Sequence, residues 1–179
     1  MKVALLLADG FEEVEALTPL DVLRRAGVEV DTIGITGKSV TGGHGITVIA
    51  DKEVSSVLAE DYAAVILPGG LIGTQNLDNS PFTDKILEYL ISSRGRIAAI
   101  CAAPTILGKR GLLKGLRAVC YPGMQDELIG AILENRGVVT DKNITTARGM
   151  GVALDFAKEL VRLFVDDESC EKISKSIAE

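Results

Sequence analysis

Residues 96–105 have the sequence RIAAICAAPT, in which four apolar residues, 97–100, are followed directly by a cysteine. A short run of branched and small apolar residues is typical of a strand buried inside a sheet. Pro104 comes three residues after Cys101, and proline is common in the first turn of a helix. The stretch therefore predicts a buried strand that turns into a helix, with Cys101 at the turn.

Short apolar runs alternate with longer amphipathic segments along the rest of the chain. We expect strands at residues 3–8, 28–34, 63–67, 97–100, 118–120 and 144–146. Apolar residues at spacings of three and four predict helices at residues 19–26, 81–93, 126–135 and 151–164. Residues 40–50 hold three glycines and predict a hairpin after the second strand. Repeated strand–helix units favour one α/β domain over residues 1–179, with a doubly wound, mostly parallel sheet and helices on both faces.

Composition and charge exclude several classes of function. Of the 179 residues, 47% are hydrophobic and 25% are charged, as expected for a domain with a full core. The net charge of −6 and the lack of a basic tract give no electrostatic basis for binding nucleic acid. No apolar run approaches the roughly 18 residues that a membrane span needs, and we interpret residues 1–10 as a strand rather than a signal peptide. Three widely spaced cysteines fit no disulfide framework, which favours a reducing compartment and a cytoplasmic location.

Four segments of unusual sequence follow predicted strands. They are ADGFEEVE at 8–15, LPGGLIG at 67–73, CAAPT at 101–105 and CYPG at 120–123. The carboxyl ends of parallel strands share one edge of a sheet, and α/β proteins bind ligands at that edge. We therefore expect the following residues to lie within reach of one another: Cys101, Glu15, Gly69, Gly70 and Tyr121.

Two interpretations of Cys101 are open on this evidence. As a nucleophile, its side chain would project from the turn, and backbone N–H groups at the start of the helix would favour the thiolate. As a structural residue, it would fill a small buried space. Cys120 and Cys170 lack such a turn, and we interpret both as structural.

Glu15 and His44 are the other candidates for chemistry. Glu15 is followed by apolar residues and can turn inward, whereas Glu12 and Glu13 suit the start of a helix. His44, the only histidine, lies in the sequence TGGHG of the predicted hairpin. It is either the base of a Cys–His pair or an exposed loop residue. With one histidine and no clustered ligands, we expect no metal site and no cofactor.

The motifs ADGFEEVEALTPLDVLRRAG, LPGG, AAICAAPT and TARGMGVALDFA occur in this order over nearly the whole chain. Together they resemble the ThiJ/PfpI superfamily, in particular its branch with the Parkinson's-linked deglycase and the YajL-type bacterial stress proteins. The resemblance implies a flavodoxin-like sandwich that forms a homodimer. It also implies an oxidation-sensitive cysteine at the strand–helix turn, a position that matches Cys101.

The resemblance assigns roles to further residues. It pairs the cysteine with an acidic residue that matches Glu15, the last carboxylate of EEVE. It implies oxyanion-type donors that match the backbone amides of Gly70 and Ala102. Arg25 matches an arginine near the dimer interface, and Arg148 matches the TxRG arginine, for which we expect a structural role.

Two positions depart from the family pattern. Many members have a histidine just before the proline that matches Pro122, where this chain has Tyr121. Several members have an arginine in the hairpin where this chain has His44. The family's enzymes are usually drawn with Cys, Glu and His acting together, so the enzymatic interpretation is weakened unless His44 reaches the pocket, from its own chain or another subunit. The protease-like branch has a histidine where this chain has Ala102, which argues against peptidase activity.

Two functions use the same residues. In the first, Cys101 attacks a small aldehyde or glycated substrate while Glu15 moves protons, as in a glyoxalase or deglycase. In the second, Cys101 is oxidised to sulfenate or sulfinate, and this oxidation alters a chaperone or partner activity. The sequence does not separate these alternatives.

Overall fold

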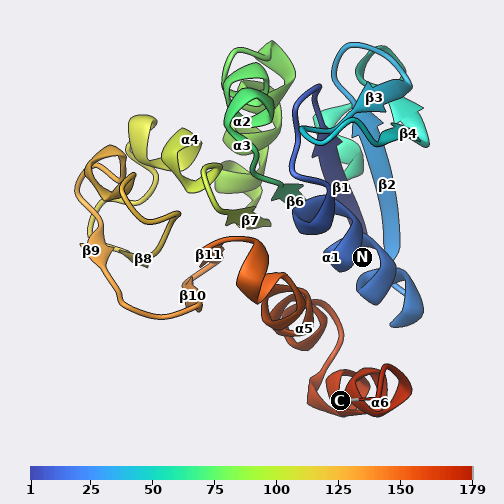
Figure 1. The fold of residues 1–179 in the computed structure, drawn as a ribbon. Coiled ribbons are helices and arrows are strands. Elements are labelled where there is room, and N and C mark those ends of the chain that lie inside the picture. The colour runs from blue at the N-terminus through green and yellow to red at the C-terminus, as the bar shows by residue number, and fades with distance from the viewer. Residues whose placement is uncertain (179) are drawn as a thin grey trace.

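The computed structural model describes residues 1–178 and is built on a seven-stranded sheet in the order β10-β11-β7-β6-β1-β2-β5 (Figure 1). The strands are β1 (Lys2–Leu7), β2 (Glu29–Gly34), β5 (Lys52–Glu53), β6 (Ala64–Leu67), β7 (Arg96–Ile100), β10 (Val138–Asp141) and β11 (Ile144–Ala147). Every neighbouring pair is parallel except β10 and β11, which are antiparallel. The central strand β6 is buried at every residue, because helices cover both faces of the sheet. The predicted α/β architecture is confirmed.

Six helices form two layers, one on each face. They are α1 (Glu13–Arg25), α2 (Leu71–Asp78), α3 (Pro81–Ser93), α4 (Pro104–Lys109), α5 (Ala153–Phe164) and α6 (Asp167–Ser176). Leu23 of α1, Phe156 of α5 and Ile173 of α6 share one core with one face of the sheet. Ile86 of α3 and Ile106 of α4 belong to the core on the other face. Figure 1 shows these two layers, with α1 and α5 side by side.

The predicted hairpin at 40–50 is confirmed. It consists of β3 (Ser39–Thr41) and β4 (Thr47–Ile49), which pair antiparallel outside the main sheet. Its turn end is tied to the loop after β1, because the Gly10 amide donates to the Thr41 carbonyl at 2.8 Å. Short 3-10 turns, η1 (Val54–Ser56) and η2 (Ala59–Asp61), then lead into β6.

The segment after α4 differs most from the prediction. The prediction of a helix at 126–135 is wrong, because this stretch forms the 3-10 turn η3 (Gln125–Glu127) and strand β9 (Ile132–Leu133). Gly130 sits at a φ of 78°, where an α-helix cannot continue, and its carbonyl accepts from the Gly115 amide at 2.8 Å. The expected strand at 118–120 is shorter and earlier, as β8 (Arg117–Ala118), and pairs only with β9.

The first helix begins earlier than predicted and carries a proline in its interior. Pro19, expected at the helix start, lies in the second turn of α1 and leaves the Glu15 carbonyl without its usual donor. Two further helices were not predicted. α2 follows Gly70 directly, and α6 is capped by the Asp166 carboxylate, which accepts from the Ser169 amide at 2.7 Å.

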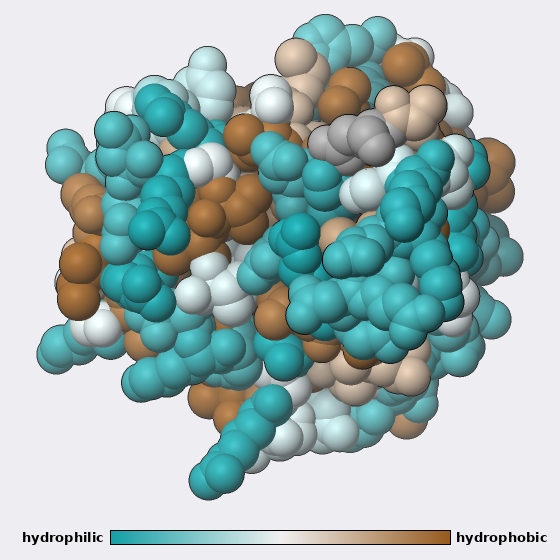
Figure 2. Space-filling view, turned by 90° about the horizontal axis from the view of Figure 1, so that it is seen from below, coloured by the Kyte–Doolittle hydropathy of each residue, from teal (hydrophilic) through white to brown (hydrophobic). Residues whose placement is uncertain are grey.

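The lower face of the molecule is polar. Figure 2 shows this face, near the end of α6, as mainly hydrophilic with scattered apolar side chains. Within the described residues, no helix is both long enough and apolar enough to cross a membrane.

The packing of α5 yields a test of the core. Phe156 is fully buried between α5 and the sheet, so Phe156→Ala should lower the free energy of unfolding by about 3–5 kcal/mol. Phe164→Ala, a matched change at the partly buried end of the same helix, should lower it by clearly less. Urea unfolding followed by circular dichroism measures both, and equal losses would contradict this account of the core.

Candidate active site

Cys101 occupies a strained turn directly after β7. Its φ is 65°, a region that residues with a side chain rarely adopt. Two backbone hydrogen bonds hold it there: the Cys101 amide donates to the Ala147 carbonyl at 2.9 Å, and the Tyr121 amide donates to the Cys101 carbonyl at 2.8 Å. The turn therefore projects the thiol out of the sheet, between β11 and the segment that carries Tyr121.

Glu15 points inward from the first turns of α1 and meets this thiol. Its side chain is almost fully buried, and its Oε2 accepts a hydrogen bond from the Gly69 amide at 3.1 Å. Gly69 packs closely against both side chains. A Cβ at this position would stand 2.4 Å from the Glu15 oxygen and 2.6 Å from the Cys101 Cβ, so only glycine fits. The site therefore depends on the first glycine of LPGG.

Burial dominates the electrostatics of the Cys101–Glu15 pair. It raises the pKa of Glu15 to about 7, an effect that the charge of Glu12 increases. It also raises the pKa of the Cys101 thiol, and the neighbouring Glu15 carboxylate raises it further, while the amides of Gly70 and Ala102 lower it. Two adjacent anions cannot both be desolvated cheaply, so the pair retains at least one proton at neutral pH.

Gly70 and Ala102 supply the amides that face the sulfur. Gly70 has a φ of 87°, a conformation open to glycine, and it immediately precedes α2. Ala102 begins the turn into α4, where its carbonyl accepts from the Thr105 hydroxyl at 2.8 Å. Since α4 has only six residues, these individual amides matter more to the thiol than the dipole of the helix.

A small cavity opens beside the thiol. It measures about 290 Å³ and is lined by Tyr121, Pro122 and residues 148–152. Gly149 lies between the cavity and the thiol. A Cβ on Gly149 would be 3.5 Å from the Tyr121 ring and 3.9 Å from the Cys101 sulfur. Sequence reasoning placed Tyr121 here but missed Gly149 and Met150. Their position directly after β11, at the same sheet edge, was the available signal.

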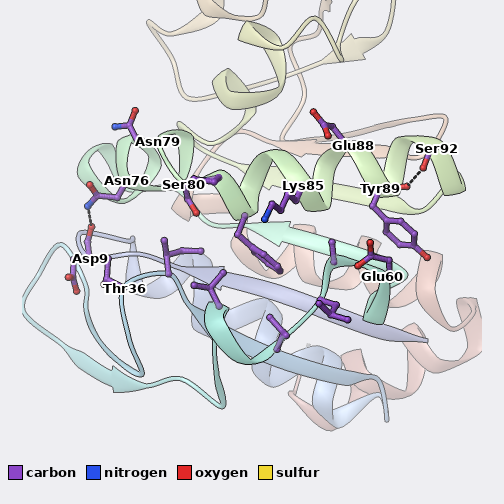
Figure 3. A pocket seen from close by; sticks show the side chains of 17 residues that line it. Asp9, Thr36, Glu60, Asn76, Asn79, Ser80, Lys85, Glu88, Tyr89 and Ser92 are labelled. Atoms are coloured by element: carbon purple, nitrogen blue, oxygen red, sulfur yellow. Dashed lines mark hydrogen bonds between the residues drawn. The ribbon is translucent and has the colours of Figure 1, made fainter.

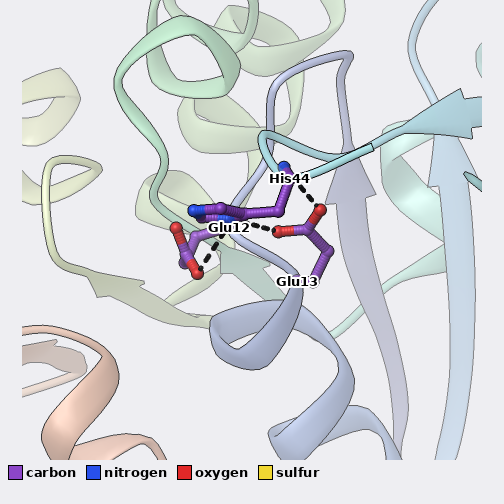
Figure 4. A group of neighbouring side chains, drawn as sticks. All are labelled: Glu12, Glu13 and His44. Atoms are coloured by element: carbon purple, nitrogen blue, oxygen red, sulfur yellow. Dashed lines mark hydrogen bonds and ion pairs between the residues drawn. The ribbon is translucent and has the colours of Figure 1, made fainter. Parts of the chain in front are cut away.

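His44 and Arg25 lie apart from the thiol in this chain. The His44 ring contacts the start of α1, with its Nδ1 2.9 Å from the Glu13 carboxylate (Figure 4). Arg25 is ten residues beyond Glu15, about 15 Å along α1, and its Nε pairs with Asp21 at 2.7 Å. Within one chain, neither residue replaces the histidine that the family pattern places near the cysteine. Arg148 is exposed, and its Nη1 lies 3.4 Å from the Asn135 side-chain oxygen.

The other two cysteines lack this environment. Cys120 and Cys170 are both buried among apolar residues, and burial raises the pKa of Cys120 to about 11. Cys101 is partly accessible to solvent. Of the three thiols, it alone combines access with a neighbouring carboxylate.

A much larger cavity, about 1190 Å³, lies between α3 and the η1–η2 turns (Figure 3). Lys85 and Tyr89 of α3, together with Glu60 of η2, line it. At its end, the Asn76 amide donates to the Asp9 carbonyl at 2.8 Å. No cysteine or histidine is among its lining residues, so size alone does not locate the chemistry.

The fold and the turn at Cys101 place the protein among α/β proteins that present a thiol at the carboxyl edge of a parallel sheet. Within this class, the chain belongs to the DJ-1/PfpI family, whose pattern matches residues 1–163. This match confirms the resemblance drawn from the motifs.

Similar proteins span almost the same length. Protein dj-1beta of Drosophila melanogaster is 34% identical over 175 residues, covering 96% of this chain and 94% of that protein. A Pyrococcus abyssi protein named as a deglycase is 33% identical over 165 residues, covering 91% and 99%. The structure of oxidized Toxoplasma gondii DJ-1 matches with a TM-score of 0.94 at 33% identity, covering 99% and 97%.

Substitutions at Glu15 test where the shared proton resides. Our hypothesis is that it resides on the carboxyl group, with the amides of Gly70 and Ala102 stabilising the thiolate. The amides of Gly69 and Met150 stabilise the carboxylate and act in the opposite direction, so the variants decide between the two sites. Glu15→Gln keeps a donor and should change the thiol pKa only slightly. Glu15→Asp, one methylene shorter, should raise it, and Glu15→Leu should raise it further.

Thiolate absorbance against pH in the three Glu15 variants measures this order. A thiol pKa that falls in Glu15→Leu would show instead that the parent keeps its proton on sulfur beside an ionised carboxylate. Identical titrations in all variants would show that Glu15 does not influence Cys101.

Proposed function

We propose that the protein is a cysteine-dependent enzyme of the glyoxalase or deglycase type that acts on small reactive carbonyls. The observation that carries this proposal is the contact between a strained, accessible thiol and a buried carboxyl group with a pKa near neutrality. A carboxyl group of this kind can both donate and accept a proton at physiological pH. The relative named as a deglycase supports the same class of substrate.

The proposed reaction begins when the Cys101 thiolate attacks the aldehyde carbon of a 2-oxoaldehyde. A C–S bond forms, and the carbonyl oxygen takes the proton of Glu15 to give a hemithioacetal. The amides of Gly70 and Ala102, which face the sulfur, are placed to stabilise the developing oxyanion.

The Glu15 carboxylate then removes the proton from the former aldehyde carbon and returns it to the neighbouring carbonyl carbon, while the proton on the first oxygen moves to the second. The product is a thioester of a 2-hydroxy acid, which water hydrolyses to release the acid and the free thiol. The steps balance with water as the only co-reactant. With a glycated amine as substrate, the thiolate would displace the amine from the hemiaminal carbon: the C–N bond breaks, the amine leaves with the proton of Glu15, and the same hemithioacetal results.

The cavity beside the thiol suits a substrate of this size. Its volume of about 290 Å³ and its Tyr121 wall favour a small molecule with an apolar end. Tyr121 occupies the position of the family's histidine, so proton transfer in this proposal rests on Glu15 alone.

The alternative is a redox-responsive protein in which Cys101 is oxidised to sulfinate and little catalysis occurs. The similarity to an oxidized DJ-1 structure favours this alternative, as does the absence of a histidine beside Cys101 among the described residues. A protonated Glu15 would donate to a sulfinate oxygen as well as to a substrate. The three free cysteines support the further proposal of a cytoplasmic location.

The activity test is lactate formation from methylglyoxal. Cys101→Ser should reduce the rate at least about 100-fold, because the nucleophile is lost. Cys170→Ser, a matched change at a buried cysteine of α6, should keep the parent rate. A parent protein that forms no lactate, yet places sulfinate first on Cys101 under mild peroxide, would contradict the enzyme and favour the redox alternative.

We also propose that the protein is a homodimer that uses α1 and the β3–β4 hairpin as its contact surface. Val14 of α1 and Ile46 and Ile49 of the hairpin are apolar and exposed, by 42%, 53% and 72%. Light scattering at micromolar concentration should therefore give twice the 18.9 kDa mass of the chain. Ile49→Glu should shift this mass towards the monomer, whereas Ile91→Glu on α3 should not. A monomer mass for the parent would contradict the dimer.

A further inference from the structure

Three potential metal ligands converge at the tip of the β3–β4 hairpin, contrary to the expectation of no clustered ligands. Figure 4 shows the side chains of Glu12, Glu13 and His44 facing one another, and one donor atom of each lies within 4.8 Å of the others. His44 Nδ1 is 2.9 Å from Glu13 Oε2 and 3.7 Å from Glu12 Oε1. A tetrahedral ion with bonds of about 2.0–2.1 Å separates its ligand atoms by about 3.3 Å. The observed distances lie on either side of this value.

With His44 neutral, as a metal ligand must be, the charge of the cluster is not balanced within the described residues. Glu13 is only 4% exposed, and the Glu12 side chain is 19% exposed. Among residues 1–178, the ion pairs of both carboxylates run to His44, and no lysine or arginine pairs with either. Buried carboxylates are normally paired with a full positive charge or bound to a metal. The start of α1 contributes about half a positive charge, which leaves room for a dication.

The ligands are held in place by backbone contacts. The Gly43 amide donates to the Phe11 carbonyl at 2.8 Å, which fixes the hairpin tip against the start of α1. Glu13 Oε1 accepts from the His44 amide at 2.8 Å, so Oε2, which faces His44 Nδ1 at 2.9 Å, is the oxygen that would bind an ion in place of this contact. Because the two segments are already ordered, binding an ion would require little additional ordering.

We propose that Glu12, Glu13 and His44 form a binding site for a divalent transition-metal cation of the zinc class. One imidazole nitrogen and two carboxylates suit Zn²⁺ or Co²⁺ better than Mg²⁺ or Ca²⁺, which prefer oxygen ligands throughout. In the single chain the His44 side chain is 70% exposed, so an ion can reach the site there and keep a water as its fourth ligand. Cys101 is not part of this site.

Zinc titration by calorimetry tests the proposal. The Cys101→Ser variant serves as the background, because the free thiol is itself a potential zinc ligand. We expect one zinc per chain and an affinity at least tenfold lower after either His44→Asn or Glu12→Gln. Both residues retain some exposure, so these variants should fold, which circular dichroism verifies. Glu127→Gln, an exposed carboxylate on η3, is the matched control and should bind as tightly as the background.

Cobalt provides a second measurement on the parent protein. Co²⁺ should give ligand-field bands typical of nitrogen and oxygen ligands, and these should persist in Cys101→Ser but vanish in His44→Asn. A thiolate charge-transfer band that disappears with Cys101→Ser would place the ion at the thiol and overturn the proposal. Unchanged zinc affinity in His44→Asn would also overturn the proposal. So would the absence of binding below millimolar zinc, whether the site does not bind the ion or a second chain covers the hairpin.

Discussion

The close approach of three chain segments at Gly69 is the constraint on which the site depends. The loop after β6 packs against both the Glu15 carboxyl group and Cys101, with no space for a Cβ. The Gly69 amide binds the carboxyl group, and the Gly70 amide faces the sulfur. One backbone turn therefore orients both groups and forms hydrogen bonds with them. This close contact desolvates the pair and raises both pKa values, which places the carboxyl group near neutrality.

The sheet converts sequence order into this contact. Glu15 lies 86 positions from Cys101 in sequence, yet β1, β6 and β7 are parallel neighbours whose carboxyl ends meet at one edge. The antiparallel β10 leaves β11 as the last parallel strand, so the segment after β11 closes the site with Gly149. The candidate site is thus assembled from strand ends, where open α/β sheets generally bind ligands.

The sequence predicted those parts of the molecule whose structure is set by local pattern. The central strands β1, β6 and β7 are short and mainly apolar, and the turn at Cys101 follows from such a run ending at a cysteine before a proline-bearing segment. The edge strands β5 and β10 are short and more polar, and they were not predicted. The prediction of a helix at 126–135 was wrong because Gly130 has a positive φ, which turns the backbone. The spacing of apolar residues, on which the prediction rested, does not reveal a positive φ. The cluster of Glu12, Glu13 and His44 was not predicted, because 31 residues separate the hairpin tip from Glu13 and only tertiary packing joins them.

The backbone conformation of Cys101 couples the candidate nucleophile to the stability of the fold. A left-handed residue with a side chain costs roughly 1–2 kcal/mol relative to glycine, and glycine at this position would relieve that strain. The change to glycine would relieve the strain only by removing the thiol and its packing. The strained conformation and the thiol therefore belong to the same residue, so this part of the stability cannot be recovered by glycine while the thiol is kept.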